Sequence, residues 1–164
     1  MISLVRIGRL DDLSDIMEML NLCKADMKKR KLNIWNDDYP NQRIIEDDLK
    51  SNGAVVYEDN GKVVAFLVMY PKHPDACEEI FSDHTNYCLI QRVMVHPKYR
   101  RHGYAQKILA FVEEQGFSSI RLLTRNTNTY SVNLYTKLGY RVVKSQTRGN
   151  EIMQTCEKVL KGDF

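Results

Sequence analysis

The fold of this chain is decided by the segment QRVMVHPKYRRHGYA, which spans Gln91–Ala105. It begins as an apolar strand, passes through a basic turn and enters a helix led by Gly103. The first backbone N–H groups of a helix have no partner inside the helix, and the helix dipole adds partial positive charge there. Arginine and lysine side chains around such a turn strengthen the attraction for an anion. The segment therefore predicts a site for a phosphorylated ligand.

The pattern Arg100-x-x-Gly103-x-Ala105 within this segment is too short to identify the ligand. It is not the dinucleotide fingerprint G-x-G-x-x-G, because only one of the three glycines is present. It is not a P-loop either, because no Gly-Lys-Ser/Thr follows. A tight strand-to-helix turn with solvated arginines explains the residues equally well, so both interpretations stay open on this segment alone.

Hydrophobic periodicity on both sides of the segment predicts alternating strands and helices. We expect strands at 3–7, 54–58, 62–70, 87–95, 119–124, 140–145 and 151–160. We expect a first helix capped by Asp11 or Asp12 and ending in the charged run 28–31, and further helices at about 42–50, 103–115 and 129–138. Asn60-Gly61 between two β-rich runs predicts a hairpin. The order indicates an α/β (α+β) fold with a mixed sheet covered by helices, and nothing suggests more than one domain over residues 1–164.

A second cluster lies on the predicted helix at 129–138. Asn128, Ser131 and Tyr135 are spaced i, i+3 and i+7, which places them along one face. With Leu134 and Leu138 toward the core, we expect the phenol of Tyr135 to look out from the helix. A phenol with its ordinary pKa of about 10 can donate a proton in a suitable site. The alternative is that Tyr135 is a packed amphipathic aromatic residue, as most tyrosines are.

Composition narrows the classes of function. The net charge of +3 is too small to argue for nucleic acid, and no uncharged run approaches the length of a membrane span. The four cysteines form no C-x-x-C pair, so we expect neither a disulfide framework nor a metal site. Charged residues near the start interrupt the apolar core that a signal peptide needs, so the cytoplasm is the expected location. The basic run Lys28–Lys31 is expected to be a solvated helix end.

Two blocks of the sequence together resemble a known family. Leu89–Ala105 is similar to the acetyl-CoA-binding motif of the GCN5-related N-acetyltransferases (GNAT family). Asn128, followed by LYTKLGY at Leu134–Tyr140, resembles the next block of that family. The spacing of the blocks and the order of elements also fit, so the resemblance covers nearly the whole chain. It implies a GNAT-like, mostly antiparallel seven-stranded sheet flanked by about four helices.

The resemblance implies a binding site for acetyl-CoA as co-substrate. The strand before the turn would carry a bulge, and its backbone at Val93, Met94 and Val95 would bind the pantetheine arm. The backbone N–H groups from Arg101 to Ala105 would bind the pyrophosphate, with Gly103 permitting close approach. The predicted cofactor-binding residues also include Arg100, His102, Tyr104, Asn128 and Ser131. Lys98 and Lys107 are further cations that could meet the remaining phosphate charge.

The implied reaction is direct attack of a neutral amine on the thioester carbonyl. Tyr135 matches the general acid of the family, which protonates the departing thiolate. The predicted strand at 87–95 carries no Asp or Glu that could serve as the base. Glu78, Glu79 and Asp83 precede this strand, and no spacing rule favours one of them. His96 precedes Pro97 at the strand exit, where a role in the turn is the better interpretation, so no base is assigned.

The resemblance also implies that the acceptor, a small-molecule or peptide amine, is held by the loop between the first two helices and by the strands near the thioester. Trp35 and Tyr39 in that loop, and Gln91 on the strand, are the candidate substrate-binding residues. Aromatic and acidic side chains there suit a cationic amine, although such a loop also commonly packs its tryptophan on the core. Two other functions remain: a catalytically silent acetyl-CoA sensor, and a nucleic-acid or protein-binding module that kept the fold. A homodimer is compatible with the sequence but not required by it.

Overall fold

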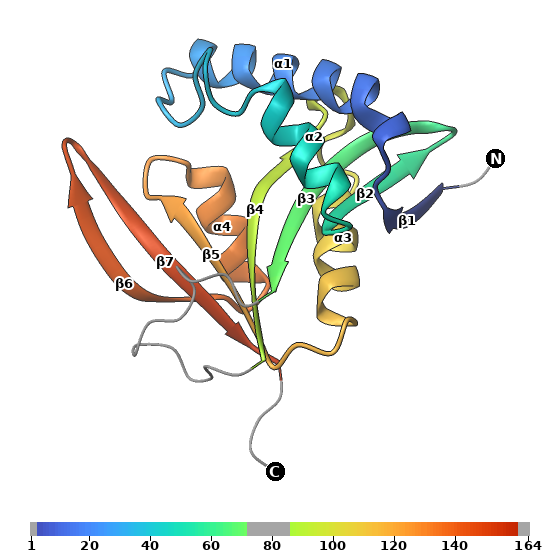
Figure 1. Cartoon of the computed structure of the whole chain (residues 1–164). Helices are drawn as coiled ribbons and strands as arrows, with labels where there is room; N and C mark the ends of the chain where they lie inside the picture. Colours follow the sequence, from blue (N-terminus) through green and yellow to red (C-terminus); the bar gives the residue numbers. More distant parts are fainter. Residues whose placement is uncertain (1–2, 72–85, 161–164) are drawn as a thin grey trace. The chain divides into compact units, whose positions relative to one another are not determined.

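The computed structural model describes residues 3–71 and 86–160, with seven strands and four α-helices in that part of the chain (Figure 1). Two short 3-10 helices precede α1 and α3. In chain order the elements are β1 (Ser3–Ile7), η1 (Leu10–Asp12), α1 (Leu13–Lys29), α2 (Gln42–Lys50), β2 (Ala54–Asp59), β3 (Lys62–Pro71), β4 (Tyr87–Val95), η3 (Pro97–Tyr99), α3 (Tyr104–Glu113), β5 (Ser119–Arg125), α4 (Thr129–Lys137), β6 (Arg141–Arg148) and β7 (Glu151–Val159).

The strands hydrogen-bond in the order β1-β2-β3-β4-β5-β7-β6. The β4–β5 pair is parallel, whereas the β1–β2, β2–β3, β5–β7 and β6–β7 pairs are antiparallel. The predicted mixed, mostly antiparallel seven-stranded sheet is therefore confirmed. By contacts the chain divides into two compact units, Met1–Met69 with Arg92–Val112 and Tyr70–Gln91 with Glu113–Phe164. The expectation of a single domain stays a prediction, and each unit is described by itself.

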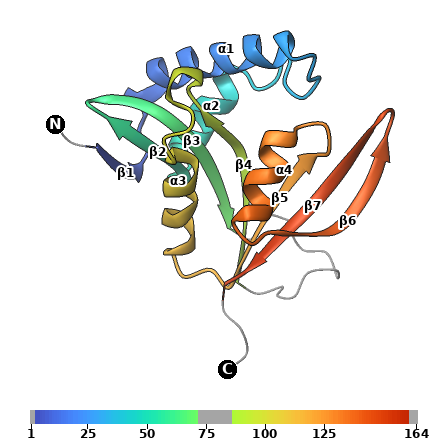
Figure 2. The ribbon, with the colours of Figure 1, turned by 180° about the vertical axis from the view of Figure 1, so that it is seen from behind.

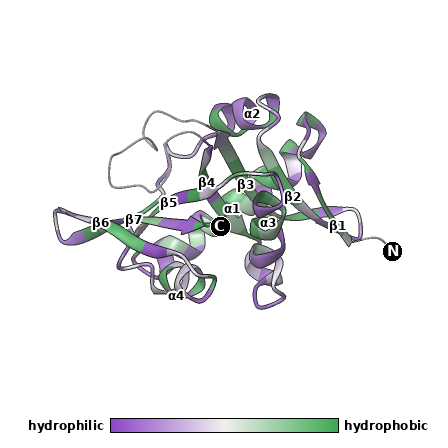
Figure 3. Cartoon of the chain, turned by 90° about the horizontal axis from the view of Figure 1, so that it is seen from below, coloured by the Kyte–Doolittle hydropathy of each residue, from purple (hydrophilic) through white to green (hydrophobic). Residues whose placement is uncertain are grey.

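The first unit is built on the β1–β2–β3 meander. Helices α1 and α2 cover one face of these strands and α3 covers the other, as the opposite views in Figures 1 and 2 show. Strand β3 is buried over seven consecutive residues, Val63–Met69, because both of its faces are covered. The ribbon coloured by hydropathy shows the same apolar stretch (Figure 3). Asn60 and Gly61 both have positive φ, 51° and 82°, so the predicted β2–β3 hairpin is confirmed.

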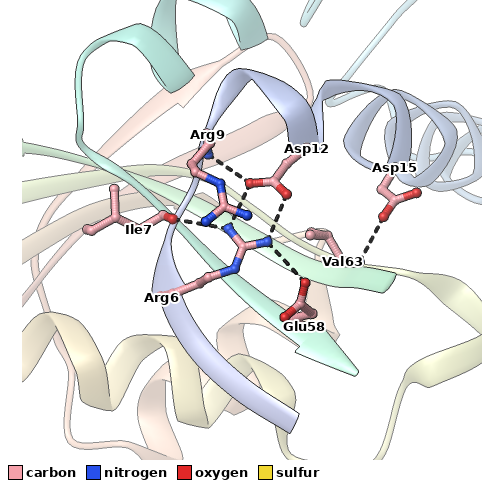
Figure 4. A network of polar contacts seen from close by, with 7 residues as sticks. All are labelled: Arg6, Ile7, Arg9, Asp12, Asp15, Glu58 and Val63. Carbon is pink, nitrogen blue, oxygen red and sulfur yellow. Dashed lines mark hydrogen bonds and ion pairs between the residues drawn. The ribbon is translucent and has the colours of Figure 1, made fainter. Parts of the chain in front are cut away.

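An ion-pair network ties β1 to the start of α1 (Figure 4). Arg6 donates from Nη1 and Nη2 to the two carboxylate oxygens of Asp12, at 2.9 and 2.8 Å, and also reaches Glu58 at 3.2 Å. The Asp12 carboxylate accepts a further bond from the backbone N–H of Arg9 at 2.7 Å. Burial raises the pKa of Asp12, but the hydrogen bonds from Arg6 and Arg9 outweigh it, so the net pKa is lowered. The carboxylate is therefore held in its charged form.

Acid should weaken this network by protonating Asp12. Because the folded-state pKa of Asp12 lies below its ordinary value of 3.8, the group stabilises the fold above that pH and loses this contribution as the pH falls through the folded-state pKa. We expect the free energy of unfolding, measured with urea between pH 6 and pH 3, to fall more steeply in the wild type than in Asp12→Asn. Equal slopes for the two proteins would contradict the assignment.

The second unit pairs β5 with β7 and β7 with β6, and α4 covers one face of these strands (Figure 2). Its interior contains a charged pair, with Arg121 on β5 and Glu157 on β7, both at most 1% exposed. Arg121 Nε lies 3.5 Å from Glu157 Oε2, and Ser119 donates to the same oxygen at 2.6 Å. The guanidinium also lies 4.4 Å from the centre of the Tyr87 ring. Strand positions facing each other across β5 and β7 therefore satisfy a buried charge inside this unit.

Three further findings concern the cysteines, metal-binding groups and helix length. Cys23, Cys88 and Cys156 are free and buried, while Cys77 lies outside the described residues. No group of three or more His, Cys, Asp or Glu residues in residues 3–71 and 86–160 is arranged to hold a metal ion. None of the helices in the same part of the chain has the length and hydropathy needed to cross a membrane.

Candidate active site

Strand β4 has an irregular backbone at Arg92, whose φ of 54° lies in the left-handed region. A residue with positive φ breaks the regular pleat, as in a β-bulge. The parallel ladder to β5 covers Tyr87–Leu89 and stops before this point. This irregularity at Arg92, called the β4 bulge below, lies on the strand where the sequence resemblance implied a bulge. Beyond it, Met94 is buried, Val93 and Val95 are half-buried, and the Cys23 thiol donates to the Val95 carbonyl at 3.4 Å.

The strand leaves the sheet through a turn organised by His96. Its Nδ1 accepts the backbone N–H of Lys98 at 3.1 Å, which caps η3, and its backbone N–H donates to the Val64 carbonyl at 2.8 Å. Burial lowers the pKa of His96, with a further lowering by the charge of Lys62. The imidazole is thus neutral and buried, and it takes part in the turn, which is the role that the sequence favoured.

The loop between η3 and α3 contains two residues in the left-handed region, Arg101 with φ 67° and Gly103 with φ 76°. His102 closes this loop, because its Nδ1 lies 3.0 Å from the Tyr99 carbonyl and 2.8 Å from the Arg100 carbonyl. Both partners are acceptors, so Nδ1 carries the hydrogen. The turn then leads into α3, whose buried residues Ala105, Ile108, Leu109 and Val112 anchor the helix on the sheet.

The cations predicted for the turn divide into two groups. Arg100 donates from Nη1 to Asp26 of α1 at 2.8 Å, so its guanidinium holds the turn against that helix. The Lys107 ammonium lies 5.3 Å from the centre of the Tyr57 ring and 5.7 Å from that of Tyr104. Arg101 and His102 are exposed, and so are Lys98 and Lys107. Between η3 and α3, Arg101 and His102 are the exposed residues.

Tyr104 points toward β2. Its ring stacks on Tyr57 with centroids 4.1 Å apart, and its hydroxyl donates to Asp59 at 3.0 Å. Desolvation raises the pKa of Tyr104, and the bond to Asp59 adds to the rise. Since its side chain is engaged with β2, any contact of Tyr104 with a ligand of the turn would be made by the backbone.

In the second unit, Asn128 begins helix α4. Its side-chain oxygen accepts the backbone N–H of Ser131 at 3.4 Å, the geometry of an N-cap. This places Asn128 and Ser131 together at the helix start, as their spacing predicted. Their role toward a cofactor stays a prediction.

Tyr135 differs from the expectation that its phenol looks out from the helix. It is the one buried residue of α4 and is 6% exposed, whereas Leu134 and Leu138 are only half-buried. Its ring packs edge-on against Tyr140, with centroids 5.5 Å apart. The outward orientation was therefore wrong, because the large ring fills the interior that the leucines were expected to fill. Burial raises the pKa of Tyr135, so the phenol keeps its proton at neutral pH.

The loop between α1 and α2 holds Trp35 half-buried and Tyr39 41% exposed. The Tyr39 hydroxyl accepts a hydrogen bond from Arg92 Nη1 at 3.0 Å, which places it beside the β4 bulge. Gln91, the other predicted acceptor residue, is half-buried on β4. Glu78, Glu79 and Asp83, the carboxylates considered as a base, lie outside the described residues.

The sequence matches the acetyltransferase (GNAT) family over residues 14–140, which is more than half of the chain. This chain belongs to the acetyltransferase (GNAT) family. A comparison with curated protein sequences found no match.

Solved GNAT structures share the fold over nearly the whole chain. One is an acetyltransferase of the GNAT family from Streptococcus agalactiae 2603, with a TM-score of 0.84 and 21% identity, covering 98% of this chain and 96% of that one. Another is yncA, a putative acetyltransferase from Salmonella typhimurium with its cofactor acetyl-CoA, with a TM-score of 0.74, 17% identity and coverage of 100% and 97%. The ribosomal-protein-S18-alanine N-acetyltransferase from Escherichia coli has a TM-score of 0.69, 15% identity and coverage of 99% and 97%.

Two residues beside the loop between α1 and α2 were missed by sequence reasoning. Arg92 and Asp48 form a bidentate ion pair, Nε to Oδ2 at 2.7 Å and Nη2 to Oδ1 at 2.6 Å. Asp48 is buried between Ile45 and Leu49 on the inward face of α2. A carboxylate on the apolar face of a helix is a signal that a cation lies opposite, although it does not tell which one.

Proposed function

We propose that this GNAT protein is an N-acetyltransferase that moves the acetyl group of acetyl-CoA to a primary amine. The observation that carries the proposal is the β4–α3 turn, with Arg101 and Gly103 at positive φ and Arg101 and His102 exposed before the first turn of α3. Backbone N–H groups at the start of a helix favour a phosphate. Membership of the family indicates that this phosphate belongs to acetyl-CoA.

The residues of the turn fit a pyrophosphate. A Cβ added at Gly103 would find Gln106 Oε1 as its nearest neighbour, 3.7 Å away, so the chain itself leaves this side of the turn open. An oxygen of the ligand can occupy the space that a side chain would fill. We assign the pyrophosphate to the N–H groups of Arg101 to Ala105, and the pantetheine arm to the backbone of Val93 to Val95 beyond the bulge.

The proposed chemistry is a direct transfer. The neutral amine forms a bond from its nitrogen to the acetyl carbon and the carbon–sulfur bond breaks. The nitrogen then loses one proton to water, and the thiolate takes a proton. We assign that proton to Tyr135 on the basis of its position in the family motif. Its buried phenol, with a pKa raised by desolvation, keeps its proton at neutral pH and so has a proton to donate.

Titration of the purified protein with acetyl-CoA, CoA and dephospho-CoA by calorimetry tests the binding part of the proposal. We expect saturable binding of the first two, and weaker binding by about tenfold when the 3′-phosphate is absent, because a charge-assisted hydrogen bond is lost. Release of free thiol in the presence of primary amines tests the transfer. Binding without thiol release for any amine would support the acetyl-CoA sensor instead, and no binding would contradict both.

A further inference from the structure

The Arg92–Asp48 pair is buried at the contact between β4 and α2. The two side chains are 6% and 3% exposed, and both carboxylate oxygens accept a bond from the guanidinium. A buried ion pair carries a large desolvation cost, and a hydrophobic pair of the same volume would often stabilise the fold as well. Arg92 also adopts a φ of 54°, which is unfavourable for an L-residue that has a Cβ atom. Packing between β4 and α2 therefore does not by itself account for this ion pair.

The pair extends to a residue that is exposed to solvent. The third nitrogen of the guanidinium, Nη1, donates to the hydroxyl of Tyr39 at 3.0 Å, while Tyr39 itself is 41% exposed. A phenol oxygen that accepts a bond from a guanidinium directs its own O–H away from that cation. The hydroxyl of Tyr39 is thus oriented as a hydrogen-bond donor beside the β4 bulge.

The backbone that carries Tyr39 is held as firmly as its hydroxyl. The side-chain oxygen of Asn36 accepts the N–H groups of Asp38 and Tyr39, each at 2.8 Å, and the N–H of Asn36 donates to the Tyr39 carbonyl at 2.9 Å. Lys24 donates from Nζ to the carbonyl of Pro40. An exposed tyrosine fixed at its backbone and at its hydroxyl has little rotamer entropy left to lose on binding a ligand.

We propose that Arg92 and Asp48 are positioning residues that aim the Tyr39 hydroxyl at a carbonyl oxygen of the acceptor. The inference rests on the proposed transferase function and narrows its acceptor to an amine with a neighbouring carbonyl group, such as a peptide N-terminus or an α-amino amide. A simple alkylamine has no oxygen to accept this bond. The transfer step itself is unchanged, since Tyr39 acts on binding of the acceptor and not on the departing thiolate.

Tyr39→Phe is the sharpest test, because it removes only the hydroxyl and leaves the buried pair in place. With the tripeptide Ala-Ala-Ala as acceptor, we expect KM to rise about fivefold, while kcat and the Kd for acetyl-CoA stay within about twofold. With butylamine, we expect the variant and the wild type to have the same KM. Comparing the variant with the wild type for each amine cancels the difference in pKa between the two amines.

Asp48→Asn tests the positioning role without relying on turnover. Trp35 is the single tryptophan of the chain and lies in the same loop, so its fluorescence reports on loop order. We expect acrylamide to quench Trp35 about twofold more efficiently in Asp48→Asn than in the wild type. The matched control is Asp12→Asn, which weakens a similar bidentate Arg–Asp pair in the same unit (Figure 4) and should leave Trp35 quenching and the acceptor KM unchanged.

The outcomes distinguish a failure of the proposed Tyr39 role from a failure of the proposed transferase function. An equal change of KM for both amines in Tyr39→Phe, or unchanged Trp35 quenching in Asp48→Asn, would overturn the positioning role. Binding of acetyl-CoA with turnover of butylamine but not of Ala-Ala-Ala would overturn the acceptor class and leave the transferase function standing. Absence of acetyl-CoA binding would overturn the transferase function, and the acceptor role would fall with it.

Discussion

Replacing Tyr135 by phenylalanine is expected to lower kcat about 100-fold, while the Kd for acetyl-CoA changes by less than about twofold. General acid catalysis contributes on the order of 10² to 10⁴ in rate, and this variant removes the donated proton without removing the ring. Because the ring is buried against Tyr140, the packing of α4 should be retained. Steady-state kinetics by thiol release and calorimetry with acetyl-CoA measure the two quantities separately.

Tyr140→Phe is the matched control for this variant. Tyr140 is 5% exposed, and within the described part of the chain its hydroxyl has no hydrogen-bond partner. Removing a buried hydroxyl that makes no bond should leave kcat unchanged and keep or slightly raise the melting temperature. If both variants lost activity equally, disruption of α4 would explain the loss and the assignment of Tyr135 as general acid would be wrong. An unchanged kcat in Tyr135→Phe would contradict it directly.

Gly103→Ala is expected to raise the Kd for acetyl-CoA by about 10- to 100-fold. A residue with a Cβ at a φ of 76° carries strain of about 1–2 kcal/mol, and the methyl group would occupy the open side of the turn assigned to the pyrophosphate. The loss should appear as weaker binding in calorimetry and as a higher KM for acetyl-CoA. The fold-change in kcat should be smaller than the fold-change in KM, because the turn does not take part in the proton transfer.

Gly61→Ala separates strain from binding. Gly61 has a φ of 82° in the β2–β3 hairpin, and a Cβ there would meet no atom within 4 Å. Both variants should therefore lose a similar amount of stability, about 1 kcal/mol, from the strained backbone. Only Gly103→Ala should lose affinity for acetyl-CoA. Equal affinities of the two variants for acetyl-CoA would contradict the assignment of the pyrophosphate to this turn.

Local pattern was sufficient to predict most of the helices and strands. Alternation with period 2 and recurrence with period 3.6 are properties of neighbouring residues, so the predicted 42–50 helix and 87–95 strand agree with α2 and β4 at both ends. Asn60-Gly61 specified its hairpin for the same reason, since two consecutive residues supply the positive φ angles. The least accurate ends were those of α3 and β6, where the predicted and observed bounds differ by one to three residues.

Partners far apart in the sequence were beyond prediction. Arg100 was expected to meet phosphate, yet its guanidinium pairs with Asp26, which is 74 residues away on α1. Arg92 and Asp48 are 44 residues apart, and neither stood out in its own segment. Ion-pair partners are selected by which side chains meet when helices pack on the sheet, and no spacing rule within one segment records that meeting.

The sequence by itself determined the order of strands and helices, the glycine-led turn before α3 and membership of the GNAT family, because these depend on local pattern and on the spacing of motifs. Only the tertiary structure decided that Tyr135 is buried and that Arg100 pairs with Asp26 of α1. It also decided that Arg92 joins Asp48 to the hydroxyl of Tyr39. The reason is physical: burial and charge pairing depend on which surfaces come into contact, and that is decided by packing of the whole chain.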